Sequence, residues 1–176
     1  MSKSPFVPVC FFFLAVAGFP FAAQAGKEDP ALLGLGTGLA DALQWAKDDN
    51  DAEPAAEFRV EYRAEPFVWE IRPWVGAQID TNGALYGAGG ILLDIDVLHP
   101  VVITPSFGIG LYHDGGGRDL DNTLEFRSQL ELAYEFEGGS RLGVAVSHIS
   151  NAGLGDRNPG TESAVVYYHL PVGSLF

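Results

Sequence analysis

Three residues near the end of the chain have types and a spacing that suit nucleophilic catalysis. Ser150 is a candidate nucleophile, and His148 precedes it by two positions, about 6.6 Å away along an extended strand, where an imidazole can reach the hydroxyl. A carboxylate such as Glu162 can then hold the imidazole in the right tautomer. A His-x-Ser pair by itself is a weak signal, so the hypothesis depends on whether the fold brings the three side chains together.

The segment that joins Ser150 to Glu162 is rich in groups that can donate hydrogen bonds. Residues 151–161 contain two asparagines and three glycines. Side-chain amides and backbone N–H groups stabilise the negative charge that develops on a carbonyl oxygen during acyl transfer. Asn158-Pro159-Gly160 also has the composition of an ordinary turn, and this simpler interpretation stays open.

The elements that must position these residues have the pattern of β-strands. Residues 124–136 alternate between an apolar and a charged face, as a strand between two environments does. The apolar face holds Leu124, Phe126, Leu130, Leu132, Tyr134 and Phe136, with Ser128 as its polar member; the other holds Glu125, Arg127, Gln129, Glu131 and Glu135. The pattern recurs with Phe58, Val60 and Tyr62 against Glu57, Arg59, Glu61 and Arg63, and with Phe67, Trp69 and Ile71 against Glu70 and Arg72. Interleaved acids and arginines indicate a small barrel lumen, with the aromatic face toward lipid.

Eight segments have strand character. They cover about 32–38, 55–64, 66–79, 84–94, 101–112, 122–136, 140–150 and 162–176. Eight strands can close a barrel whose interior is just filled by side chains. Tight connections at Glu65-Pro66 and Gly138-Gly139 contrast with longer ones at 39–54, 113–121 and 151–161, as periplasmic turns contrast with external loops, although the connection near Asn82-Gly83 is short. The sequence predicts an all-β, eight-stranded antiparallel transmembrane barrel, with a soluble secreted barrel as the alternative.

Strand parity then places the candidate residues. Leu142, Val144 and Val146 share a face that continues to His148 and Ser150, and this is the lipid face. On the last strand Glu162 has the parity of Phe176, a terminal aromatic that resembles the assembly signal of outer-membrane proteins and makes the barrel assembly machinery an expected partner. A carboxylate that faces hydrocarbon is costly unless it is paired, which favours a functional partner for it.

The N-terminal residues have the features of an export signal. Lys3, an apolar stretch from Phe6 to Phe21 and the small-x-small site Ala23-Gln24-Ala25 predict a signal peptide over 1–25 and a mature barrel domain over 26–176. The single cysteine, Cys10, lies in the expected signal, so the mature protein has no thiol chemistry. A Gram-negative outer-membrane location follows.

The charge balance excludes several partners. The net charge of −13 becomes −14 once residues 1–25 are removed, because they hold one lysine and no acid, and this argues against nucleic acid. The acidic segment 48–53 is interpreted as a solvated loop. The four histidines lack metal-ligand spacing, and no phosphate-binding or dinucleotide motif occurs, so neither a metal nor a cofactor is expected.

Two motifs resemble a known family. His148-Ile149-Ser150-Asn151-Ala152 and Asn158-Pro159-Gly160-Thr161-Glu162 look like the signature of the lipid A 3-O-deacylases, the PagL family of outer-membrane enzymes. The similarity extends upstream through the segments 58–63, 104–110 and 124–128, whereas 39–54 matches weakly.

The resemblance implies an eight-stranded barrel with a membrane-facing triad: Ser150 as nucleophile, His148 as base and Glu162 as orienting acid. Asn151 and Asn158 match the family's active-site asparagines, and the amide of Gly153 could complete the oxyanion hole. The implied reaction is hydrolysis of the 3-O-linked acyl ester of lipopolysaccharide without a metal. Surface phospholipase or esterase activity and a non-catalytic barrel remain alternatives, and a homodimer is one assembly to consider.

Overall fold

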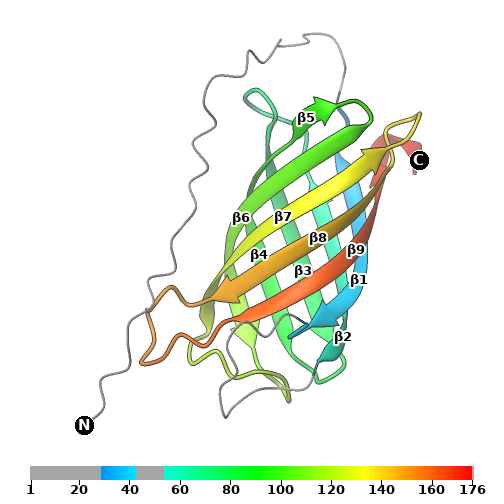
Figure 1. The fold of residues 1–176 in the computed structure, drawn as a ribbon. Helices are drawn as coiled ribbons and strands as arrows, with labels where there is room; N and C mark the ends of the chain where they lie inside the picture. The colour runs from blue at the N-terminus through cyan, green and yellow to red at the C-terminus, as the bar shows by residue number, and fades with distance from the viewer. Residues whose placement is uncertain (1–28, 43–53, 176) are drawn as a thin grey trace.

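The computed structural model describes residues 29–42 and 54–175, and these form a closed antiparallel β-barrel (Figure 1). The expected signal peptide, the acidic segment 48–53 and Phe176 lie outside the described residues. The strands are β1 (Leu32–Ala40), β2 (Ala55–Arg63), β3 (Ile71–Asp80), β4 (Leu85–Leu93), β5 (Ile95–Leu98), β6 (Val101–His113), β7 (Leu124–Glu135), β8 (Arg141–Ser150) and β9 (Thr161–Pro171). Each barrel strand pairs with its neighbours in the chain, and β1 pairs with β9 to close the ring. Eight strands build the barrel, as predicted, and β5 is a short extension that pairs only with β6.

Two strand boundaries differ from the sequence prediction. The strand expected from residue 66 begins at Ile71, so Phe67 and Trp69 lie in the connection rather than on the lipid-facing strand. The prediction of a tight turn at Glu65-Pro66 is therefore wrong, because the connection runs from the end of β2 at Arg63 to Ile71. Phe67 donates its N–H to the Ile71 carbonyl, and Ile71 donates to the Val68 carbonyl. These local turn bonds use the backbone groups that an extended ladder would need.

The last strand is also shorter than expected. It ends at Pro171, which pairs with Leu32, the first residue of β1. Residues Val172–Ser174 then form a single 3-10 turn instead of continuing the alternation. The ladder stops because the neighbouring strand begins there, and an extended backbone without a partner leaves its polar groups unsatisfied.

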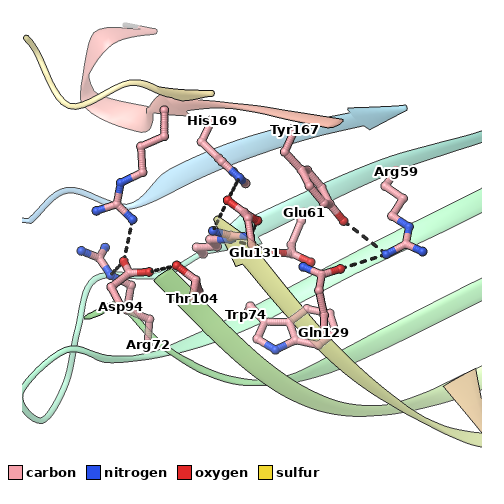
Figure 2. A network of polar contacts seen from close by, with 12 residues as sticks. Arg59, Glu61, Arg72, Trp74, Asp94, Thr104, Gln129, Glu131, Tyr167 and His169 are labelled. Carbon is pink, nitrogen blue, oxygen red and sulfur yellow. Dashed lines mark hydrogen bonds and ion pairs between the residues drawn. The ribbon is translucent and has the colours of Figure 1, made fainter. Parts of the chain in front are cut away.

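Paired charges occupy much of the lumen, as the sequence predicts (Figure 2). Arg63 donates to Glu61 at 2.8 Å and to Glu131 at 2.6 Å, and Arg127 donates to the other oxygen of Glu61 at 2.7 Å. The ring Nε2 of His169 lies 2.9 Å from Glu131. All of these side chains are buried, so each carboxylate needs its cationic partners to offset the loss of solvation.

A second group of charges lies in the lumen at the end of the barrel where β1 begins. Asp94 interrupts the extended run between β4 and β5, and its carboxylate accepts from Thr104 at 2.7 Å and from Arg141 at 2.7 Å (Figure 2). Arg72 lies 3.0 Å from the same carboxylate and donates to the backbone carbonyl of Pro30. Asp94 keeps the inward parity of Tyr86 and Leu92, and its carboxylate meets Arg72 from the neighbouring strand β3 and Arg141 from β8.

The outer face of the barrel is apolar. Phe58, Val60 and Tyr62 are 55%, 46% and 41% exposed, whereas the alternating charged residues of β2 are buried. Strands of about 9–11 tilted residues cross the hydrocarbon of a bilayer, and most of the barrel strands have this length. Within the described ranges, no helix is long and apolar enough to span a membrane.

Removal of one lumen carboxylate should destabilise the barrel. Glu131→Ala should lower the free energy of unfolding by about 3–5 kcal/mol, because it leaves Arg63 buried without its closest partner. Denaturant unfolding in lipid vesicles, followed by heat-modifiable gel migration, measures this. Glu137→Ala in the exposed 136–140 turn is the control and should change stability by no more than about 0.5 kcal/mol. Equal stability of the two variants would contradict the role given to the buried pairs.

Candidate active site

The first half of the candidate site is a histidine–glutamate pair across two neighbouring strands. His148 on β8 lies directly opposite Glu162 on β9 in the ladder. The ring Nδ1 of His148 is 3.0 Å from Glu162 Oε1, so a proton on Nδ1 is donated to the carboxylate. The two side chains are 39% and 22% exposed and continue the outward row of Val144 and Val146. The pairing fixes the tautomer that leaves Nε2 as a base.

Ser150 lies at the end of β8, two residues beyond His148 and partly exposed on the same face. Across the ladder on β7, Phe126 lies opposite Ser150 and Ser128 lies opposite His148. In the part of the chain that the structure describes, no hydrogen bond joins the Ser150 hydroxyl to the imidazole. Catalytic hydrogen bonds are commonly long in a ligand-free enzyme and tighten when the substrate is bound. The structure therefore pairs His148 with Glu162 and places Ser150 two residues further along the same face of β8.

Gly160 packs against the imidazole, a contact that neither the turn interpretation of Asn158-Pro159-Gly160 nor its place in the family motif predicts. Its backbone has φ +68°, and an added Cβ would lie 2.6 Å from His148 Cε1. A left-handed backbone and this close approach both require glycine. Gly160 therefore limits the movement of the His148 ring on one side. The feature of the sequence that could have identified it is its position directly before β9, two residues from Glu162.

Asn151 holds the 151–160 loop from inside. Its side chain is buried, and Nδ2 donates to the carbonyls of Leu120 at 2.9 Å and Arg157 at 2.8 Å. Its Oδ1 accepts the N–H of Gly153 at 2.8 Å, and its own N–H donates to Asn158 Oδ1 at 3.1 Å. Both Nδ2 hydrogens of Asn151 and the N–H of Gly153 are occupied in this conformation.

Asn158 is the candidate donor whose amide hydrogens stay available. Its Oδ1 is engaged with Asn151, which turns the side chain in a defined direction, while its Nδ2 makes no hydrogen bond to any residue of the described ranges. The side chain is exposed at the mouth of the loop. Of the three residues expected to form an oxyanion hole, Asn158 is therefore the one whose amide donor is not already engaged by another described residue.

A family model describes most of this architecture. The model of the lipid A 3-O-deacylase (PagL) family matches residues 56–171, which include both strands of the histidine–glutamate pair and the loop between them. This match covers more than half of the chain. The protein belongs to the lipid A 3-O-deacylase (PagL) family.

Individual relatives agree with this assignment. The lipid A deacylase PagL of Pseudomonas aeruginosa is 35% identical over 57 residues, which are 32% of this chain and about a third of the relative's length (33%). The crystal structure of the outer-membrane enzyme PagL superposes with a TM-score of 0.61 at 18% identity, over 80% of this chain and 99% of that one. Neisserial surface protein A gives a TM-score of 0.61 at 10% identity, over 83% and 99% of the two chains, so fold similarity extends beyond the family.

Family membership and the closed barrel with its apolar outer face place this PagL-family protein in the outer membrane.

The outer face also carries a shallow groove directly next to the histidine–glutamate pair. Ala164 lines the groove; it is opposite Leu39 on β1 and Val146 on β8 and lies two positions from Glu162. Small Ala164 leaves a hollow between larger neighbours, and Leu130, Leu132, Val144 and Val166 extend it along the barrel.

The contact between Gly160 and the imidazole gives a direct test of the site. Gly160→Ala should reduce ester hydrolysis by about tenfold or more, because the new methyl group displaces the His148 ring from its pairing with Glu162. The rate is measured on purified protein in detergent. Gly138→Ala, at φ +99° with open space around it, is the matched control for backbone strain and should keep the wild-type rate. Equal rates for both variants and wild type would show that the position of the His148 ring does not depend on its contact with Gly160.

Proposed function

We propose that the protein hydrolyses the 3-O-linked acyl ester of lipid A, with Ser150 as nucleophile, His148 as general base and Glu162 as the orienting acid. The observation that carries the proposal is the 3.0 Å contact between His148 Nδ1 and Glu162 Oε1 on the lipid-facing surface beside Ser150. Membership of the lipid A 3-O-deacylase family supports the choice of substrate and bond.

The reaction follows the logic of a serine esterase. Ser150 Oγ attacks the acyl carbonyl carbon while His148 Nε2 takes the hydroxyl proton, and Glu162 stabilises the resulting imidazolium. The Nδ2 group of Asn158 donates to the oxyanion, while Asn151 and Gly153 hold the loop that carries it. The sugar 3-oxygen leaves with the proton from His148, and a water activated by the same base then frees the fatty acid and restores the serine.

The position of the site suits a substrate that is itself part of the membrane. With a periplasmic N-terminus, β8 runs outward and ends at Ser150, near the boundary between headgroups and acyl chains of the outer leaflet. That leaflet is lipopolysaccharide, so the ester bonds already lie at the depth of the nucleophile. Holding both reactants at one height supplies part of the orientation that catalysis requires.

The groove at Ala164 offers a place for the acyl chain that is cleaved. It begins beside His148 and Glu162 and is lined almost entirely by aliphatic side chains. An acyl chain in this hollow would run along the barrel with its ester at the triad. Burying methylene groups there is favourable by about 0.8 kcal/mol each at most, since lipid is the competing environment for the chain.

Substitution of the triad provides the decisive test. Lipid A from cells that express the wild type should lose the mass of one hydroxyacyl group and keep its amide-linked chains. Ser150→Ala and His148→Ala should leave lipid A at full mass, whereas Glu162→Gln should retain part of the activity because the residue orients the base. Mass spectrometry of lipid A, repeated with purified protein in detergent, gives the readout, and heat-modifiable migration confirms that each variant has assembled.

Two results would contradict this function. Cleavage of phospholipids with lipid A at full mass would establish the phospholipase alternative. Full activity of an assembled Ser150→Ala variant would show that another group is the nucleophile.

The groove gives a second prediction. Ala164→Phe fills the hollow, so it should raise the KM for a long-chain ester several-fold and leave the hydrolysis of a short-chain ester, which does not reach the groove, close to wild type. Ala77→Phe on the outer face of β3 adds the same bulk away from the groove and serves as the control. If both chain lengths respond equally to Ala164→Phe, the groove does not hold the acyl chain.

A further inference from the structure

The connection between β6 and β7 lies against the loop that carries Asn158, although the two are more than 25 residues apart in sequence. Leu120 of this connection is buried in the same apolar cluster as Ile149, the residue between His148 and Ser150. Its carbonyl accepts one of the two Nδ2 hydrogens of Asn151. The connection therefore packs directly behind the strand end that carries the nucleophile.

Asp121 makes a specific contact to the same loop. Its Oδ2 accepts the backbone N–H of Arg157 at 2.7 Å, and its Oδ1 lies 3.3 Å from Nη2 of the Arg157 side chain. The same Nη2 of Arg157 also donates to Asp119 Oδ2 at 3.2 Å. Asp121 itself has φ +65°, an uncommon conformation for a residue with a side chain, which aims its carboxylate at the loop.

The backbone of Arg157 is thereby held on both sides. Its N–H donates to Asp121, and its C=O accepts from Asn151. The peptide that leads into Asn158 is fixed between these two bonds, and the Asn158 side chain is turned by the N–H of Asn151. The loop also passes close to Asp121 at Gly155, where an added Cβ would lie 2.8 Å from Asp121 Oδ2.

We propose that Asp121 is a positioning residue for the hydrolysis: by holding the Arg157 backbone N–H it keeps the Asn158 amide aimed at the oxyanion. This inference rests on the proposed function and adds to it a residue that does not touch the substrate. The backbone hydrogen bond from Arg157 is also the main reason why the pKa of Asp121 lies below its ordinary value, which keeps the carboxylate ionised.

The backbone contact, rather than the ion pair, carries the effect. Asp119, Asp121 and the Arg157 side chain are partly or largely exposed, and exposed ion pairs contribute little because water screens them. The backbone N–H of Arg157, by contrast, donates to the Asp121 carboxylate, so loss of that acceptor removes one of the two bonds that hold the Arg157 backbone. Loss of the acceptor should affect the transition state, where Asn158 is needed, more than substrate binding.

Four variants of the full-length protein, assayed in detergent with a lipid A substrate, separate these contributions. Asp121→Ala should lower kcat by about tenfold or more and change KM by less than about twofold. Asp121→Asn keeps an acceptor oxygen and should recover most of the rate. Arg157→Ala keeps its backbone N–H and should stay near wild type. Asp114→Ala removes an exposed carboxylate of the same connection, which pairs with His113, and should match wild type.

The outcomes distinguish the two proposals. An inactive wild type that behaves like Ser150→Ala would refute the deacylase function itself. An active wild type with an unchanged kcat for an assembled Asp121→Ala variant would refute the positioning role alone. A loss in Arg157→Ala as large as that in Asp121→Ala, expressed mainly in KM, would also overturn it, because the pair would then act on the charged substrate rather than on the loop.

Discussion

Paired charges in the lumen are the interaction on which the rest of this barrel depends. The outer face contacts lipid, so its large apolar side chains are not buried against other protein elements as they are in a soluble fold. The interior must therefore supply the specific contacts, and it does so with carboxylates shared between arginines of different strands, as Glu61 is shared by Arg63 and Arg127. A carboxylate left without its arginines would be costly in this space, so the pairs also select the register of the strands.

The same alternation that sends charges inward creates the functional surface. Every second residue of β8 and β9 faces lipid, and at the ends of these strands the apolar series gives way to His148, Ser150 and Glu162. A glutamate on this face is tolerated because His148 lies directly opposite and binds it at 3.0 Å. The interaction that lowers the cost of an exposed acid near the membrane is thus the one that, in the proposed mechanism, orients the base.

The loops at this end of the barrel act as a second layer of support. Their side chains are mainly polar, and they hold one another through backbone groups: Asn151 binds the carbonyls of Leu120 and Arg157, and Asp121 binds the Arg157 N–H. Such contacts join segments that no ladder connects. They also explain how a site on an open surface can have an ordered geometry without a cleft.

The sequence by itself determined which side chains face lipid, because alternation is a local property of an extended chain. It predicted eight strands, the charged lumen and the common face of His148, Ser150 and Glu162, and its two motifs indicated the family. The tertiary structure decided what depends on partners distant in the chain: the pairing of Asp94 with Arg72 and Arg141, and the end of the last strand where β1 begins. It also decided the contact of Gly160 with the His148 ring and the hydrogen bond from the Arg157 N–H to Asp121. Periodicity fixes the direction of a side chain, whereas its partner is set by ladder register and loop packing, which a single sequence does not encode locally.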